Sequence, residues 1–150
     1  MPGFFFPNYE LKTRNESNKT LVYDELRKKW IILTPEENVR QHLWIYLNKE
    51  FNYPKSLITI EKKIIVNQLE KRFDLLVYNK EGNPIMIAEC KSPKIGLNQN
   101  TIEQVLRYNI RLKARYLLIT NGIDLYCAEL NLKNGEMIYV KSIPFYNDIS

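Results

Sequence analysis

Apolar residues follow a helical period in one early part of the chain. In residues 35–50 they recur at the spacing of one helix face, at Val39, Leu43, Tyr46 and Leu47. Thr34 is a suitable N-cap, and Pro35 suits the first helical position. Glu37 completes a Thr-x-x-Glu capping box, which predicts a helix that begins at Pro35.

The other apolar stretches are short, and most are typical of strands. Two short strands around a turn are predicted in residues 20–33, and further strands in 56–66, 71–79, 84–90, 114–120, 123–130 and 136–143. A second helix is predicted over residues 101–112, where apolar residues again gather on one side. This order of elements predicts a mixed central β-sheet flanked by helices, an α/β layered fold.

The domain organisation is expected to be simple. Residues 1–19 are rich in proline, asparagine and charge, and are predicted to form an irregular N-terminal arm before a single domain over residues 20–150. Phe4-Phe5-Phe6 is followed at once by Pro7 and polar residues, so no signal peptide is expected. The longest apolar runs are too short for a membrane span.

Composition adds two constraints. Lys and Arg exceed Asp and Glu by 22 to 17, a net charge of +5 that permits a polyanionic partner without requiring one. The two cysteines, Cys90 and Cys127, lie in no CxxC or Cys/His cluster, which argues against a zinc site. Isolated buried thiols fit a protein of the reducing cytoplasm.

The strongest chemical signal is the charged end of an apolar strand, IMIAECKSPK at residues 85–94. Glu89 and Lys91 are two residues apart, so in a strand they share a face. A hairpin turn centred on Glu81-Gly82 places Asp74 opposite Glu89, and a turn shifted by one residue leaves Asp74 on that face.

Two adjacent carboxylates on a half-buried sheet repel each other unless a cation lies between them. Their oxygens suit Mg²⁺ or Mn²⁺, and Lys91 could then contact a water or a bound phosphate ester. The alternative is a salt-bridge network in which Asp74 pairs with Arg72 or Lys91, and Glu89 with Lys91.

The spacing of these residues resembles a known motif. Asp74, fourteen intervening residues and Glu89-x-Lys91 resemble the PD-(D/E)xK nuclease motif, with Phe73 where the motif has proline. Gln104 and Tyr108 match the Gln-x-x-x-Tyr motif of one branch of that superfamily. The blocks RFDLLVYN, IAECKSP and YLLITNGIDLYC, in this order, resemble the N-terminal nuclease domain of type I restriction enzyme R subunits, in a stand-alone version.

The resemblance covers roughly residues 20–130 and implies a restriction-endonuclease-like core that hydrolyses DNA with a divalent metal. It implies that Asp74, Glu89 and the backbone carbonyl of Cys90 bind the metal, and that Lys91 acts on the attacking water. Gln104 would assist near the phosphate. Glu37 is expected as the acidic residue of the first helix, with Glu36 as the alternative. No GxxxxGK[ST] loop is present, so ATP dependence is not implied.

Further residues are candidates for contact with DNA: Arg40, Lys94, Arg107, Tyr108 and Arg111. Arg40 has the alternative of pairing with Glu37, and Arg107 and Arg111 that of a solvated helix face. Expected partners are DNA and restriction-system subunits. The competing hypothesis for the whole chain is a non-catalytic module of the same fold that binds DNA or a partner protein.

Overall fold

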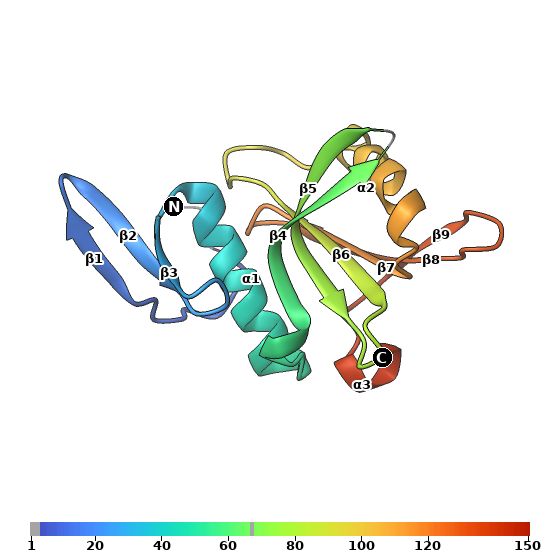
Figure 1. The fold of residues 1–150 in the computed structure, drawn as a ribbon, viewed down its shortest axis with the longest axis horizontal. Helices are drawn as coiled ribbons and strands as arrows, with labels where there is room; N and C mark the ends of the chain where they lie inside the picture. The colour runs from blue at the N-terminus through green and yellow to red at the C-terminus, as the bar shows by residue number, and fades with distance from the viewer. Residues whose placement is uncertain (1–3, 67) are drawn as a thin grey trace.

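A computed structural model describes residues 4–66 and 68–150, without the side chains of Lys62, Ile64, Val66, Lys71, Tyr108, Ile110 and Arg111 (Figure 1). The strands are β1 (Thr13–Glu16), β2 (Lys19–Asp24), β3 (Lys29–Ile32), β4 (Ile58–Val66), β5 (Leu69–Tyr78), β6 (Pro84–Cys90), β7 (Tyr116–Thr120), β8 (Leu125–Leu130) and β9 (Met137–Val140). The helices are α1 (Pro35–Phe51), α2 (Gln99–Leu112), the short α3 (Tyr146–Ile149) and a single 3₁₀ turn, Lys55–Leu57.

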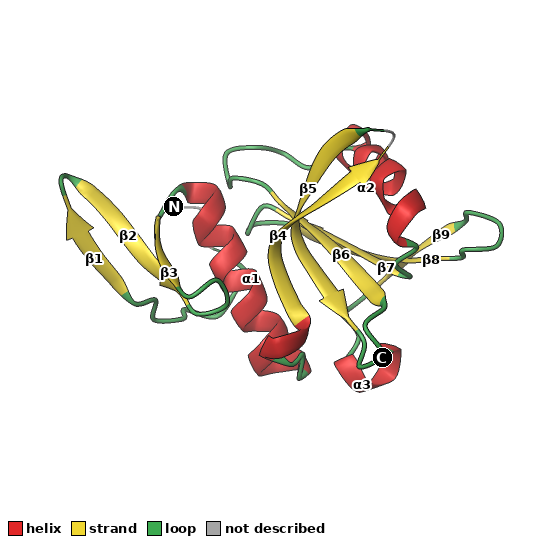
Figure 2. Ribbon diagram, viewed as in Figure 1, coloured by secondary structure: helices red, strands yellow, loops and turns green. Residues whose placement is uncertain are grey.

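The main sheet has six strands in the order β4-β5-β6-β7-β8-β9. It is mixed, because β6 and β7 run parallel while the other neighbours are antiparallel. Helices α1 and α2 lie on opposite sides of it (Figure 2). The predicted layered α/β fold with a mixed central sheet is confirmed, and it is consistent with a restriction-endonuclease-like core.

Each helix buries its own face of the sheet. On the α1 side the core includes Val39, Leu43, Leu47, Leu75, Val77, Met86, Ala88 and Leu118. On the α2 side it includes Phe73, Leu76, Ile87, Ile102, Val105, Leu117 and Ile119. Strands covered on both faces bury successive residues, which is why β6, β7 and the second half of β5 are nearly continuous apolar runs.

The β5–β6 hairpin has the predicted register where its strands pair. Leu75 lies opposite Ala88 and Val77 opposite Met86, and a bulge between Val77 and Tyr78 adjusts the turn. The ladder begins at Leu75, and the N–H of Cys90 donates to Asp74 Oδ2 at 2.8 Å. Strand β5 therefore leaves β6 at Asp74, and Figure 1 shows this end of β4 and β5 rising toward α2.

Strand β4 carries a matching irregularity. Glu61 has a φ of +55°, a left-handed conformation that is uncommon in a strand, and it lies between the paired positions Ile60/Leu75 and Lys62/Phe73. It is therefore next to Asp74 across the β4–β5 ladder. Strands β4 and β5 therefore bend at Glu61 and Asp74.

The N-terminal region is more ordered than the sequence predicted. Within the segment expected to be irregular, Thr13–Glu16 form β1, which pairs with β2 and completes a separate three-stranded sheet with β3. Phe6 is buried, and the N–H of Phe5 donates to the carbonyl of Gly122 at 3.0 Å. Proline content suggested an irregular arm, but backbone pairing and aromatic packing anchor it.

The C-terminal prediction also needs correction. The last strand, predicted over 136–143, ends at Val140, and Pro144 precedes α3, which was not predicted. Among the described residues, no helix is long and apolar enough to cross a membrane. Both cysteines are free and buried.

Candidate active site

Asp74 lies at the centre of the charged residues, where β5 leaves β6. Its Oδ2 accepts the hydrogen bond from the N–H of Cys90. Its Oδ1 accepts hydrogen bonds from Arg40 on α1, at 2.6 Å from Nη2 and 3.2 Å from Nε. Asp74 is only 9% exposed, so both oxygens are held by the protein rather than by water.

Glu89 and Lys91 share a face at the end of β6, as the strand periodicity predicted. Lys91 Nζ lies 3.6 Å from Glu89 Oε1, which is longer than a hydrogen bond between charged groups. Burial, and then the Asp74 carboxylate to which its own carboxyl group hydrogen-bonds, raise the pKa of Glu89 to about 8. The hydrogen bond from the N–H of Cys90 to Asp74 also places Asp74 beside Glu89, where the two carboxyl groups repel each other when both are ionised.

These residues border a hollow on the α2 side of the sheet, with a volume of about 260 Å³. It is lined by Glu70, Arg72, Glu89, Lys91, Thr101, Gln104 and Val105. The structure thus brings Gln104 to the same hollow as Glu89 and Lys91, although Gln104 is on a different element. Glu70 and Arg72 were not among the predicted site residues.

On the α1 side, Glu37 is bound by several donors. Its Oε1 accepts from Arg40 Nη1 at 2.6 Å, and its Oε2 accepts from Arg27 Nη2 at 2.8 Å and Gln41 Nε2 at 3.0 Å. The Thr34 hydroxyl caps the N–H of Glu37 at 3.0 Å, as predicted. The N–H of Thr34 donates to the carbonyl of Ile32, so only the first half of the capping box forms.

The same network continues into the small sheet. Asp24 is fully buried and accepts from Arg27 Nε at 2.5 Å and from Gln41 Nε2 at 3.1 Å. Glu61 lies 3.3 Å from Arg27 and 3.4 Å from Arg40. A chain of ion pairs therefore joins the β2–β3 turn, through α1, to Asp74.

Sequence reasoning missed Asp24, Arg27, Gln41 and Glu61. Two signals were available for them. Gln41 is one turn after Glu37 and shares its helix face, and extending the strand pairing of β4 and β5 places Glu61 beside Asp74. No comparable signal marks Asp24 and Arg27, because only tertiary packing brings their turn to α1.

Glu36 and Glu37, the two acidic residues in the first turn of α1, have different surroundings. Glu37 is 4% exposed and bound within the network. Glu36 has a side chain that is 45% exposed, and it lies 3.5 Å from Arg40 Nη2. Burial, and then the Asp74 carboxylate, raise the pKa of Glu36, while Arg40 and Lys91 lower it. The geometry favours Glu36, the alternative, as the helix acid that faces the candidate site.

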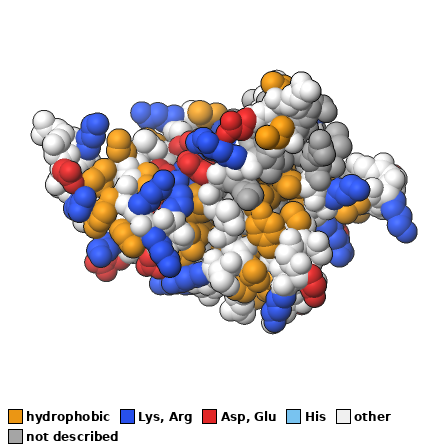
Figure 3. Space-filling model, in the orientation of Figure 1, with side chains coloured by type: hydrophobic (Ala, Val, Ile, Leu, Met, Phe, Trp, Pro, Cys, Tyr) orange, Lys and Arg blue, Asp and Glu red, His pale blue; other side chains and the backbone are white. Residues whose placement is uncertain are grey.

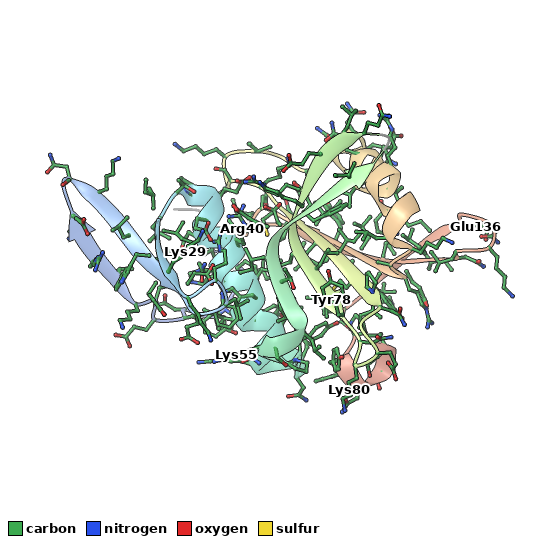
Figure 4. All side chains as sticks on the ribbon, in the orientation of Figure 1. Lys29, Arg40, Lys55, Tyr78, Lys80 and Glu136 are labelled. Carbon is green, nitrogen blue, oxygen red and sulfur yellow. The ribbon has the colours of Figure 1, made fainter. Side chains whose placement is uncertain are left out.

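The candidate DNA-contacting residues are dispersed. Lys94 and Arg107 are exposed, on the loop after β6 and on α2. The side chains of Tyr108 and Arg111 are outside the described part of the structure. Arg40 is 5% exposed and lies between α1 and β4 (Figure 4). Burial alone would lower the pKa of Arg40, but the Asp74 and Glu37 carboxylates raise it above its ordinary value. Of its two predicted roles, the geometry favours pairing with Glu37.

A hard divalent cation finds two of its preferred ligands here. Asp74 and Glu89 are adjacent carboxyl groups, and a cation between them would relieve the repulsion that helps to raise the pKa of Glu89. Within residues 4–66 and 68–150, no group of three or more His, Cys, Asp and Glu side chains is arranged to hold a metal. The Cys90 side chain is buried in the core on the α1 side of the sheet, so Cys90 would contribute only its backbone carbonyl. The donors fit a two-carboxylate site completed by that carbonyl and water.

Structural comparison finds similar folds in two solved structures. A fragment described as a "putative HsdR subunit of a type I restriction enzyme" from Vibrio vulnificus YJ016 has a TM-score of 0.55 and 20% identity, over 78% of this chain. The chain spans 24% of the length of that protein. A "putative nuclease" from Anabaena variabilis has a TM-score of 0.49 and 12% identity, over 89% of this chain and 86% of the other.

A search of curated proteins gives no match to the sequence. A family model does match it, over residues 35–144. The matched part begins with α1 and ends after β9, so it includes α1, α2 and all six strands of the main sheet. The model describes the type I restriction enzyme R protein N terminus (HSDR_N), and the chain belongs to this family.

Proposed function

We propose that this protein hydrolyses phosphodiester bonds of DNA with the help of a divalent cation, Mg²⁺ or Mn²⁺, as a PD-(D/E)xK nuclease. The observation that carries the proposal is the hollow in which Glu89, Lys91 and Gln104 meet beside Asp74. It combines a pair of carboxyl groups, an ammonium group and an amide at one end of a rigid strand. Membership of the restriction R-protein family supports the same chemistry.

Asp74 and Glu89 would hold the cation, with the Cys90 carbonyl as a further ligand. When bound, the cation would neutralise phosphate oxygens and lower the pKa of a coordinated water. Lys91 has 28% of its side chain exposed, and its ion pair with Glu89 is long at 3.6 Å, so its ammonium group could bind a water or a phosphate oxygen. Its positive charge would stabilise the negative charge that develops in the transition state.

Gln104 and Glu36 would contribute from the two helices. The Gln104 side chain borders the hollow, where its amide could donate a hydrogen bond to a phosphate oxygen. Glu36 is partly exposed beside Arg40 and could orient a water. Arg40 touches Asp74 rather than the hollow, so we assign it a positioning role: it fixes the orientation of the Asp74 carboxylate.

Exposed cations around the site would contact the DNA backbone. Lys94 follows β6 in the chain, and Arg107 is on α2, the helix that carries Gln104. Contacts of this kind fix the position of DNA without reading its sequence. We therefore propose DNA as the partner, with other restriction-system subunits supplying any sequence recognition.

One observation favours a second candidate function, a DNA- or partner-binding module without cleavage. Arg40 already neutralises Asp74 Oδ1, and its guanidinium is held by Glu37 on the other side. A cation at Asp74 has to compete with this internal positive charge. If the Arg40 guanidinium keeps its ion pair with Asp74 in place of a metal, the protein would bind DNA or a partner without cleaving DNA.

The test is nuclease activity on single-stranded, linear and supercoiled DNA with Mg²⁺ or Mn²⁺. We expect the wild type to cut and Lys91→Ala to lose activity by about 10²–10³-fold, because the missing charge acts in the transition state. Lys133→Ala is the matched control, since Lys133 is an exposed lysine in the turn between β8 and β9. It should cut as the wild type does.

Metal binding, measured by calorimetry, separates the two functions. Binding of Mn²⁺ that Glu89→Gln weakens, together with cleavage, supports the nuclease. Binding of DNA without metal binding or cleavage supports the binding module. Cleavage that persists in Lys91→Ala at the wild-type rate would contradict the proposed site.

A further inference from the structure

The small sheet presents an outward face that the candidate active site does not use. Its outward residues alternate along the strands and pair across them: Arg14 opposite Leu21, Leu21 opposite Ile32, and Tyr23 opposite Trp30. The alternate residues Val22 and Asp24 point inward and are buried. The outward face therefore collects two aromatic rings on a solvent-facing sheet.

Cations cover these rings. The Arg14 guanidinium lies 4.2 Å from the centre of the Trp30 ring. Lys12 Nζ lies 5.1 Å from the Tyr23 ring and 5.7 Å from the Trp30 ring. The two rings meet edge to face, with centres 5.4 Å apart. A cation over an aromatic ring is attracted to it by about 0.5–1 kcal/mol at an exposed site, and this contact does not use the hydrogen-bond donors of the cation.

The small sheet is fixed to the rest of the protein by its inner end. Asp24, the last residue of β2, and Arg27, in the turn before β3, belong to the ion-pair network that reaches Glu37 and Asp74. Figure 1 shows the small sheet projecting beyond α1, away from β5 and β6. Its outward face is thus held in a defined position relative to the candidate site.

We propose that this face, composed of Lys12, Arg14, Tyr23 and Trp30, binds a single strand of nucleic acid. Cationic groups for phosphates beside aromatic rings for bases are the two components of single-strand binding surfaces. A base could stack on Trp30 or on the guanidinium that already covers it. Figure 3 shows Lys and Arg side chains around apolar ones at this end of the molecule.

The charge of the face is consistent with this partner. Lys12, Arg14 and Lys19 are exposed, and Glu16 is the acidic residue that offsets them, at 3.0 Å from Arg14. Because more than half of the Glu16 side chain is exposed, this pair contributes little to stability and phosphate can replace it. The small sheet precedes residues 35–144, so this surface lies outside the part matched by the family model.

Binding is measured with a fluorescently labelled oligothymidylate of about 15 nucleotides, a length that covers one single-strand site. The buffer contains EDTA, so that hydrolysis plays no part and the outcome is independent of the proposed nuclease. We expect Lys12→Ala/Arg14→Ala to lower affinity by about 10-fold at low salt. The slope of log affinity against log salt should fall by about 1.4, or about 0.7 for each phosphate that the variant no longer neutralises.

The control double variant is Lys133→Ala/Lys141→Ala, which removes the same charge from exposed positions beside β9. It should change affinity by less than about 2-fold, since long-range charge effects are weak beyond a Debye length. Equal reductions in the two double variants would overturn the proposal, because net charge alone would then explain binding. Thermal melting of each variant checks that it is folded.

Tryptophan fluorescence measures directly whether the bound strand contacts Trp30. The chain has two tryptophans, of which Trp44 is buried and Trp30 is partly exposed. Bound oligothymidylate should quench the wild type, and Trp30→Leu should abolish the quenching and weaken binding by about 10-fold. Wild-type quenching that survives in Trp30→Leu would overturn the proposal. So would duplex DNA that binds more tightly than the single strand.

Discussion

The charged residues on the two sides of Asp74 differ in their burial and in how closely they pair. On the α1 side, Glu37, Arg40, Arg27 and Asp24 are nearly buried, and they bond to one another at 2.5–2.9 Å. On the α2 side, Glu89 and Lys91 border a hollow and lie 3.6 Å apart. Asp74 contacts both groups.

This difference indicates which charges hold the fold and which remain available for chemistry. Glu37 accepts hydrogen bonds from two guanidinium groups and from the Gln41 amide, and these donors occupy most of the acceptor positions of its carboxylate. The Glu89 carboxyl group, whose pKa is raised by burial and by the neighbouring Asp74, is poorly satisfied, and its ion pair with Lys91 is long at 3.6 Å. We therefore interpret the α1 side as a support and the α2 side as the reactive surface.

The largest effect on stability is expected from Arg40→Ala. It would leave Asp74 and Glu37 buried without their main cation, which should lower the free energy of unfolding by about 3–5 kcal/mol. Urea denaturation measures this change. Arg115→Ala is the control, because Arg115 is 57% exposed and its pair with Glu129 should contribute about 1 kcal/mol or less. Similar destabilisation in the two variants would contradict the assignment of a buried support.

An intermediate effect is expected from Gln41→Leu. The Gln41 amide donates to Asp24 and Glu37, and its oxygen accepts from Trp44 Nε1 at 2.8 Å. Leucine has a similar volume but removes all three hydrogen bonds, including the acceptor of the Trp44 indole N–H, which should cost about 1–3 kcal/mol of unfolding free energy. Gln99→Leu, at an exposed position of α2, should change it by about 0.5 kcal/mol or less. If Gln41→Leu raised the free energy of unfolding, the hydrogen bonds of Gln41 would not contribute to the stability of this network.

The smallest effect on stability is expected from Lys91→Ala, the variant that should lose most activity. Lys91 is partly exposed, and its distance from Glu89 is long, so the free energy of unfolding should change by about 1 kcal/mol or less. Thermal and urea unfolding measure it beside the nuclease assay. If Lys91→Ala were as destabilising as Arg40→Ala, the contrast between a supporting α1 side and a reactive α2 side would be wrong.

Several elements follow directly from local sequence. The helix at 35–50 was predicted from its apolar period and its Thr34 cap, and α1 begins at Pro35 with that cap in place. The apolar run before Glu89 and the turn at residues 81–84 predicted β6 and the register that brings Asp74 to Glu89. These features depend on backbone preferences and on pairing of neighbouring strands, which short-range sequence controls.

The support of the site could not be predicted in this way. Glu37 was predicted to be the acidic site residue of the first helix, with a capping box as the alternative reason for its presence, whereas its carboxylate binds Arg27 and Arg40. Nothing in the sequence around Arg27 shows that its turn packs on α1. The segment 13–16 was expected to be irregular because of the proline and asparagine content of the N-terminal region. That composition does not reveal the register in which β1 pairs with β2.

The sequence by itself determined the layered fold, the family and the strand that carries Glu89 and Lys91. Periodicity and turn chemistry act over a few residues, so they are encoded in each segment of the chain. Only the tertiary structure decided the surroundings of each charge. The bend at Glu61 and Asp74 and the docking of the β2–β3 turn bring distant residues together, and burial then determines which of these ionic groups are fully paired.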